Sequence, residues 1–121
     1  MDWPKIEVVA RPIDALLAEN DIETLDLIKI DVQGYEPKVI AGLCDTITRS
    51  PKITLLTEFW PKGIQDAGGD PREFLKTLRE LDLTLHELKA NGEITELKDD
   101  EDLIARHPGR RYTNLVGRKE S

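Results

Sequence analysis

The chain has 121 residues, which is enough for a single small domain (residues 1–121) and too few for two. Only 5% of the residues are aromatic and the formal net charge is −7, a combination that argues against binding of nucleic acid. No apolar run is long enough to span a membrane and the N-terminus lacks a signal-peptide pattern, so we expect a cytoplasmic protein that binds no membrane.

The first half of the chain predicts alternating strands and helices. Residues 6–10 form a short β-branched run typical of a strand, and Asp14 then stands where the N-cap of a short helix is expected. Residues 26–32 (DLIKIDV) are apolar enough to predict a strand buried on both faces, as in parallel sheets. A helix over residues 37–49 follows, with Pro37 in its first turn. It carries an apolar stripe made of Val39, Ile40, Leu43 and Ile47.

The second half continues the alternation and adds a hairpin. Residues 52–60 predict another buried strand, and the turn-forming residues 61–71 predict a loop. Asp70 and Pro71 then predict the start of a helix. The remaining elements are a hairpin around Asn91-Gly92, a short acidic helix over residues 99–107 and a last strand over residues 113–119. The whole order predicts an open α/β sheet with helices on both faces and antiparallel strands at one edge.

Two acidic residues follow predicted strands at the place where α/β sheets bind ligands. Open sheets of this class hold ligands beyond the carboxyl ends of their strands, which selects Asp31 and Glu58. A carboxylate there can orient a hydroxyl group, accept its proton or hold a cation. A purely structural role is equally compatible with the sequence: Asp31 would cap the turn at Gly34, and Glu58 would form an ion pair with Lys29.

Other polar residues do not predict a metal or redox site. The two histidines, His86 and His107, lack acidic or thiol neighbours at ligand spacing. The acidic run 99–102 lacks the alternating spacing of a calcium loop and is expected to be a solvated face that pairs with the nearby Arg110 and Arg111. Cys44 is the only cysteine, so no internal disulfide can form. We therefore expect no bound metal.

Residues 27–43 (LIKIDVQGYEPKVIAGL) resemble the characteristic segment of FkbM-type methyltransferases. That segment typically reads lysine-isoleucine-aspartate-valine, then glutamate or glutamine, then glycine. The glutamate that usually follows the glycine is matched by Glu36 and a later helix glycine by Gly42. The flanking segments, residues 11–20, 53–59 and 113–119, are also similar, so the resemblance covers nearly the whole chain.

The resemblance implies a Rossmann-like methyltransferase sheet and S-adenosylmethionine as cofactor. The implied reaction is O-methylation of a hydroxyl on a sugar or other small molecule. By resemblance, Asp31 lies near the reactive methyl group and the acceptor, and it is a catalytic candidate together with Glu58 on the acceptor side. Asp31, Gln33 and Gly34 are the implied cofactor-binding residues.

The resemblance extends only to the C-terminal half of such a domain. No glycine-rich turn follows a strand before Leu27, so we expect an incomplete sheet in which the strand at residues 26–32 lacks its cofactor-binding neighbour. Exposed apolar edges tend to pair, which predicts a homodimer through this strand edge or through apolar helix faces. The alternative function is a non-catalytic dimerising or interaction module. A nucleotide-binding α/β protein is a weaker alternative, because no phosphate loop is present.

Overall fold

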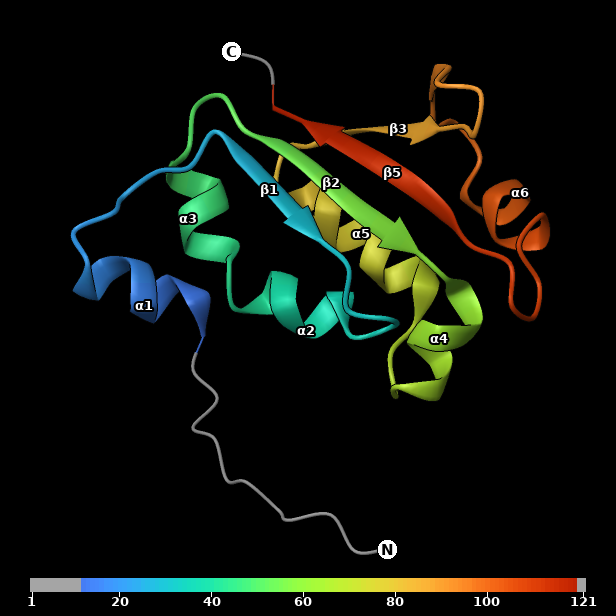
Figure 1. The fold of residues 1–121 in the computed structure, drawn as a ribbon, viewed down its shortest axis with the longest axis horizontal. Coiled ribbons are helices and arrows are strands. Elements are labelled where there is room, and N and C mark those ends of the chain that lie inside the picture. The colour runs from blue at the N-terminus through green and yellow to red at the C-terminus, as the bar shows by residue number, and fades with distance from the viewer. Residues whose placement is uncertain (1–11, 120–121) are drawn as a thin grey trace, which may run out of the picture.

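The computed structural model describes residues 12–119, and the strand expected at residues 6–10 lies outside this range. Helices and strands alternate through most of the described chain (Figure 1). In chain order they are α1 (Ile13–Glu19), β1 (Leu27–Ile30), α2 (Glu36–Ala41), α3 (Cys44–Arg49), β2 (Thr54–Phe59), α4 (Pro61–Asp66), α5 (Pro71–Glu80), β3 (Thr84–Leu88), β4 (Ile94–Glu96), α6 (Asp100–Ala105) and β5 (Thr113–Arg118).

The strands form one open five-stranded sheet in the order β1-β2-β5-β3-β4. β1 pairs with β2 in parallel, whereas β5 is antiparallel to both of its neighbours and places Arg118 between Thr54 and Thr84. β1, β2 and β3 therefore run in the same direction. β4 is antiparallel to β3 and forms one edge of the sheet, which confirms the predicted open α/β sheet with an antiparallel edge hairpin.

The helices of the described residues pack on one face of this sheet, not on both as expected. Figure 1 shows α2, α3 and α5 behind the strands. The chain passes from β1 to β2 through α2 and α3, and from β2 to β3 through α4 and α5. Both crossovers join parallel strands and move in the same direction across the sheet. Since crossovers of this kind are right-handed, both place their helices on the same side.

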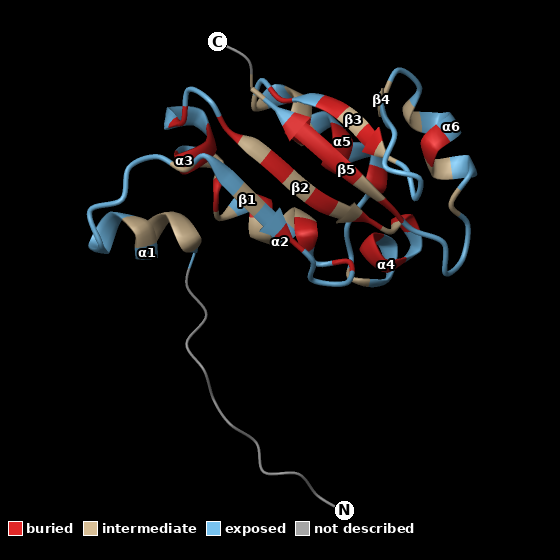
Figure 2. Ribbon diagram, turned by 45° about the horizontal axis from the view of Figure 1, so that its top comes forward, coloured by how far each residue is buried: buried red, intermediate tan, exposed pale blue. Residues whose placement is uncertain are grey.

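The core lies between that face and the helices. Along β2, Leu55, Thr57 and Phe59 are buried and alternate with the half-exposed Leu56 and Glu58, so buried and less buried bands alternate along the strand (Figure 2). The fully buried apolar side chains from the strands and helices share one cluster, whose largest members are Phe59, Ile40, Leu43, Ile47, Ile53, Leu55, Ile64, Leu75, Leu78, Leu103 and Leu115.

β1 is shorter and far more exposed than its sequence predicts. The apolar run at residues 26–32 forms a strand only at Leu27–Ile30, and Leu27 is 66% exposed. Ile30 is buried against the helices, but the opposite face of the strand has no covering element among the described residues. The prediction of burial on both faces was wrong, because within residues 12–119 only the face that carries Ile30 is covered by helices and β1 has a strand on one side alone.

Two predicted elements of the middle of the chain also differ from the structure. The single helix expected over residues 37–49 is divided at Gly42 and Leu43 into α2 and α3. The loop expected over residues 61–71 contains α4, which begins with a proline and buries Ile64. A proline in the first turn leaves helical hydrogen bonds intact, so the turn-forming composition did not exclude a helix there.

Asp14 caps a helix other than the one predicted. It lies in the first turn of α1, whose N-cap is Pro12. Its carboxylate accepts hydrogen bonds from the backbone N–H groups of Asp45 (3.1 Å) and Thr46 (3.0 Å) and from the Thr46 hydroxyl (2.5 Å). Those N–H groups belong to the first turn of α3, so Asp14 fixes α1 against the start of α3.

Local signals in the second half of the chain are confirmed. The side chain of Asp70 accepts a hydrogen bond from the backbone N–H of Arg72 and caps α5. Gly92 has a φ of 87° in the turn between β3 and β4, as the Asn91-Gly92 pair predicts.

The predicted ion pairs between the acidic run 99–102 and Arg110 and Arg111 were wrong. The run pairs instead with Arg72 and Arg79 of α5 and with Arg106 at the end of α6.

Candidate functional site

The two predicted acids come together where β1 and β2 end. Ile30 pairs with Thr57, so the next residue of each strand, Asp31 and Glu58, reaches the same place at the edge of the sheet. Parallel pairing of the strands thus juxtaposes residues that lie 27 positions apart in the chain. The rule that ligands bind beyond the carboxyl ends of parallel strands is met here by a pair of carboxyl groups.

Gln33 bridges the two acids. Its side-chain nitrogen Nε2 donates to Asp31 Oδ1 at 3.1 Å and to Glu58 Oε2 at 3.3 Å. Gln33 adopts a φ of 53° in the turn after β1, which directs its amide back toward the strand ends. Lys29, the expected partner of Glu58, forms no ion pair with it, although its charge contributes to lowering the pKa of Asp31.

The pKa values of the two carboxyl groups shift in opposite directions. Burial, reinforced by a hydrogen bond to Asp31 and by the charges of Asp31 and Glu36, raises the pKa of Glu58 to about 7. The hydrogen bond from Glu58 lowers the pKa of Asp31, which lies nearer to solvent. Near neutral pH the pair therefore holds an ionised Asp31 beside a Glu58 that is close to half protonated. Carboxyl pairs whose environments separate their pKa values in this way are common at sites of acid–base chemistry.

Glu36 holds the turn that carries this pair. It is 1% exposed, and its two carboxylate oxygens accept hydrogen bonds from the backbone N–H groups of Val32 (2.9 Å) and Gly34 (2.8 Å). Glu36 is also the first residue of α2. One carboxylate oxygen each of Asp31, Glu36 and Glu58 lies within 4.8 Å of the others. Since Glu36 is bound to the backbone, Asp31 and Glu58 are the acids left to face a ligand.

The pair borders a pocket of about 530 Å³ on the face of the sheet that no described helix covers. A volume of this size is typical of sites for small molecules. Trp60 forms part of the wall, and its indole Nε1 donates to the carbonyl oxygen of Gly109 at 2.7 Å, which fixes the loop before β5. The full lining consists of Lys29, Ile30, Asp31, Gln33, Leu56, Glu58, Trp60, Arg110, Tyr112 and Asn114.

Gly34, the third implied cofactor-binding residue, is buried behind the pocket and does not line it. Trp60 directly follows the strand that carries Glu58, whereas three other polar lining residues were not predicted for this site: Arg110, Tyr112 and Asn114. Asn114 pairs with Glu58 across β2 and β5. This neighbour relation depends on the position of β5 between β2 and β3, which no local pattern in the sequence indicates.

A second, larger groove of about 870 Å³ lies between α1 and the α2–α3 segment. Its walls are mostly apolar and include Ile13, Ala18, Tyr35 and Val39. It contains neither member of the acid pair. The pocket at the strand ends is therefore the better candidate for chemistry.

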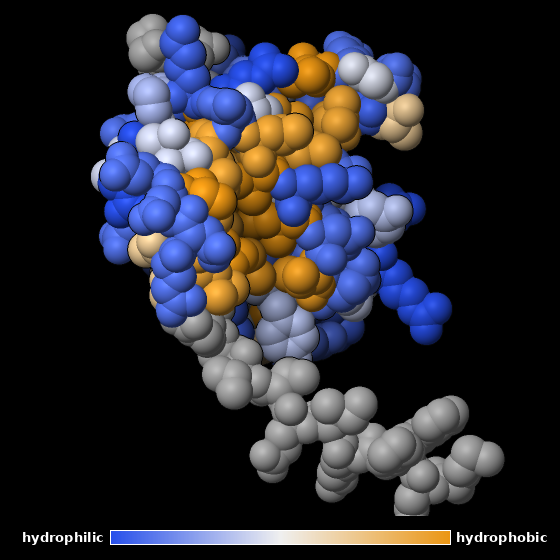
Figure 3. Space-filling view, turned by 60° about the vertical axis from the view of Figure 1, so that its left-hand side comes forward, coloured by the Kyte–Doolittle hydropathy of each residue, from blue (hydrophilic) through white to orange (hydrophobic). Residues whose placement is uncertain are grey.

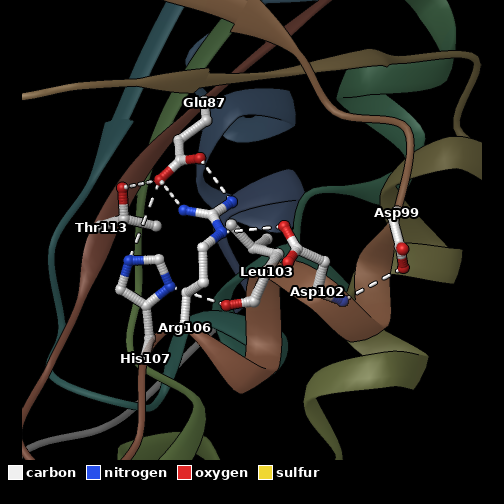
Figure 4. Close-up of polar contacts among 7 residues, drawn as sticks. All are labelled: Glu87, Asp99, Asp102, Leu103, Arg106, His107 and Thr113. Carbon is white, nitrogen blue, oxygen red and sulfur yellow. Dashed lines mark hydrogen bonds and ion pairs between the residues drawn. The ribbon is translucent and has the colours of Figure 1, made fainter.

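A separate polar cluster centres on Glu87, which points from β3 into the helix-covered side of the sheet (Figure 4). Its carboxylate accepts hydrogen bonds from Arg106 (2.9 Å) and from the Thr113 hydroxyl (2.9 Å), and His107 lies 3.9 Å away. Burial acts to raise the pKa of Glu87, but the bonds from Arg106 and Thr113 together hold it below the ordinary value. With every polar group occupied by protein partners, this cluster fastens the end of α6 to the sheet.

The fold and the pocket together define an α/β protein with an acidic ligand site beyond the ends of two parallel strands. The family model of the methyltransferase FkbM domain matches residues 4–107, which is more than half of the chain. The chain therefore belongs to the FkbM methyltransferase family. No curated protein and no solved structure gives a significant match. None of the helices at residues 12–119 is both long and apolar enough to cross a membrane.

Proposed function

We propose that the chain takes part in methyl transfer from S-adenosylmethionine to a hydroxyl group of a sugar or other small molecule, with Asp31 and Glu58 as the proton-accepting pair. The single observation behind this proposal is the Gln33-bridged carboxyl pair at the mouth of the strand-end pocket. Membership of the FkbM family supplies the reaction class.

The charges of the pocket suit the reactive end of this cofactor. S-adenosylmethionine carries a positive sulfonium centre and, when bound, supplies an electrophilic methyl group. Asp31 is ionised near neutral pH and would hold that positive charge through space, while the Gln33 amide keeps its carboxylate in place. Asp31 and Gln33 are thus the residues we assign to the cofactor.

The same pair can remove the proton of an acceptor hydroxyl. Methyl transfer would break the methyl–sulfur bond, release a neutral thioether and form the new carbon–oxygen bond, while the hydroxyl proton would pass to a carboxylate oxygen of Glu58 or Asp31. A base is most effective when its pKa lies near the working pH, and a Glu58 pKa of about 7 meets this condition. Trp60 and Tyr112 also line the pocket and would limit the orientation of the acceptor.

The second candidate function is a non-catalytic module that associates through the sheet. The observation that favours it is the edge of β1, which pairs with no strand other than β2 among residues 12–119 and has Leu27 66% exposed.

Calorimetric titration of the full chain with S-adenosylmethionine separates the two functions. We expect a dissociation constant on the order of micromolar for the wild type and binding weakened about tenfold by Asp31→Asn. Asp21→Asn is the matched control, because Asp21 is exposed, has a φ of 58° that asparagine tolerates, and lies outside the pocket. Absence of heat at roughly millimolar cofactor would contradict the catalytic proposal and favour the module.

A pH profile tests the role of Glu58 in the same chain. We expect transfer to a small hydroxyl acceptor to increase as the pH rises through about 7, following ionisation of the pair. Glu58→Gln should lower the rate and remove this dependence while leaving cofactor binding within about twofold of the wild type. A profile unchanged by Glu58→Gln would exclude Glu58 as the base.

A further inference from the structure

Arg110 is a positive charge at the strand-end pocket that has no acidic partner. Its side chain lines the pocket, and it forms no hydrogen bond or ion pair with any residue at positions 12–119. The acidic run 99–102, which was expected to pair with it, is paired with other arginines. The guanidinium of Arg110 is therefore left to bind a group that the described chain does not supply.

The loop that carries Arg110 is held in place by two hydrogen bonds. The backbone N–H of Arg111 donates to the carbonyl oxygen of Pro108 at 3.1 Å and closes a turn with Gly109 and Arg110 at its centre. Gly109 has a φ of 60°, and its carbonyl oxygen accepts the bond from the indole of Trp60 at 2.7 Å. Since Trp60 itself lines the pocket, the backbone from which Arg110 extends is tied to the pocket wall.

The order of the strands places Arg110 on the acceptor side of the pocket. Asp31 follows β1, Glu58 lies near the end of β2, and Asn114, the cross-strand neighbour of Glu58, lies near the start of β5. Arg110 belongs to the loop that enters β5 at Thr113. Because β2 lies between β1 and β5, Glu58 lies between Asp31 and the β5 side of the pocket. A cofactor with its sulfonium at Asp31 would leave the β5 side to the acceptor.

The charge of Arg110 also lies apart from the acid pair. The charge of Lys29 contributes to lowering the pKa of Asp31, whereas that of Arg110 is not among the charges that shift the pKa of either acid. The side chain of Asn114 forms no hydrogen bond with a described residue, so its amide can also bind a ligand. The pocket thus offers a proton acceptor on one side and a cation on the other.

The polar lining of this pocket contrasts with another part of the surface. Figure 3, which brings forward the side of the molecule at the left of Figure 1, shows a band of hydrophobic side chains. Most residues that line the strand-end pocket are instead charged or polar. A ligand that matches this lining must itself carry polar or charged groups.

We propose that the methyl acceptor carries a carboxylate or phosphate group besides its reacting hydroxyl, and that Arg110 selects the acceptor by binding this group. A guanidinium can donate two parallel hydrogen bonds to either kind of group. Sugar acids and sugar phosphates are the two sources of this chemistry. The identity of the ligand as the methyl acceptor rests on the proposed function, whereas binding of the anion by Arg110 requires no methyl transfer.

Titration of the full chain without cofactor, followed by amide NMR spectra, tests the binding step. Glucuronate and glucose-6-phosphate are the anionic probes, and glucose is the neutral control. We expect the anions to bind about tenfold more tightly than glucose, and this preference to shrink as salt is raised from about 50 mM to about 500 mM. A preference for one anion alone would identify carboxylate or phosphate as the group recognised. Equal affinities for all three sugars, or no binding of either anion at about 50 mM, would overturn the proposal.

Two neighbouring arginines provide a matched pair of variants. Arg110→Gln should abolish the preference for the anions, and Arg110→Lys should retain part of it because the charge remains while the paired hydrogen bonds are lost. Arg111→Gln is the control, because Arg111 is also exposed but does not line the pocket. Both side chains are exposed, so neither substitution should affect folding. An equal loss of preference in Arg110→Gln and Arg111→Gln would contradict a specific role for Arg110.

The competing ligand of Arg110 is the cofactor, since S-adenosylmethionine also carries a carboxylate. We expect Arg110→Gln to leave the affinity for S-adenosylmethionine within about twofold of the wild type. Cofactor binding weakened about tenfold by Arg110→Gln would assign Arg110 to the cofactor and overturn its role in acceptor selection. If the wild type binds no cofactor, the proposed methyl transfer fails, but anion binding that depends on Arg110 would still be measured. The two failures are therefore distinguishable.

Discussion

Gly34 lies directly against the backbone of Gly63, at the contact between the turn after β1 and helix α4. A Cβ atom at Gly34 would lie 2.4 Å from the carbonyl oxygen of Gly63, and Gly34 has a φ of 102°. The turn that carries Asp31 and Gln33 can therefore pack this closely against α4 only because both contacting residues, Gly34 and Gly63, lack a side chain.

Replacement of Gly34 by alanine should destabilise the chain more than backbone strain alone would. We expect Gly34→Ala to lower the free energy of unfolding by about 3 kcal/mol or more, because the methyl group must displace backbone as well as adopt a disfavoured φ. Gly68→Ala is the matched control: Gly68 has a φ of 92° and no atom within 4 Å of its Cβ position. It should cost only about 1 kcal/mol in urea unfolding. Equal losses in the two variants would exclude a role for the Gly63 contact.

Removal of the Asp14 carboxylate should loosen the start of α3. Asp14→Ala deletes the acceptor for two backbone N–H groups and the Thr46 hydroxyl, and we expect a loss of about 1–2 kcal/mol. Asp14→Asn keeps one carbonyl oxygen in place and should lose less than half as much. Hydrogen exchange of the Asp45 and Thr46 amides checks the location, and unchanged protection of these amides in Asp14→Ala would contradict the assignment.

Truncation of Glu87 should be among the most destabilising changes to a polar residue. Glu87 is 5% exposed, and its loss leaves Thr113 and part of the Arg106 guanidinium without an acceptor, so we expect Glu87→Ala to cost about 3 kcal/mol. Glu93→Ala, an exposed change in the adjacent hairpin, should alter stability by less than about 0.5 kcal/mol.

The same carboxyl group should make the chain sensitive to acid. Its folded-state pKa lies below the ordinary value, so its contribution is complete above the ordinary pKa and is lost as the pH falls through the folded value. Chemical unfolding across the acid range checks this, and Glu87→Gln should flatten the profile there. An equally steep profile in Glu87→Gln would show that other carboxyl groups are responsible.

Glu58 should have the opposite effect on stability at neutral and alkaline pH. Its pKa is raised to about 7 in the folded chain, so folding favours the protonated form and stability falls as the pH rises from the ordinary value of 4.5 through 7. Glu58→Gln cannot ionise, so relative to the wild type it should gain on the order of 1 kcal/mol between about pH 5 and about pH 8.5, a figure discounted for its partial exposure. The exposed Glu93→Gln should gain nothing over that range. A constant difference between Glu58→Gln and the wild type would contradict the raised pKa.

Local patterns in the sequence predicted most of the elements, because their causes are local. The cap at Asp70, the turn at Gly92 and the periodicity of β2 and α5 each involve residues a few positions apart. Where the cause was distant, prediction failed. The exposure of β1 depends on which strand lies next to it, and Asp14 caps a helix about thirty residues away.

The same distinction holds for the site. Asp31 and Glu58 were both predicted at the ligand edge, because the carboxyl ends of parallel strands lie at the same edge of a sheet. The bonds of Glu36 to Val32 and Gly34 were not predicted, since they require the turn to fold back on Glu36. Asn114 and Arg110 could not be predicted, because they reach the pocket only through the insertion of β5 between β2 and β3.

The place of β5 in the sheet also constrains how the chain can fold. Among the described strands this one comes last in sequence, yet it pairs with β2 over Thr113–Arg118 and with β3 over Asn114–Arg118. Until those residues have left the ribosome, β1–β2 and β3–β4 remain two separate pairs of strands with open edges. The sheet can close only after β5 has been synthesised, so the β2 side of the strand-end pocket must wait for residues that follow β2 by more than fifty positions.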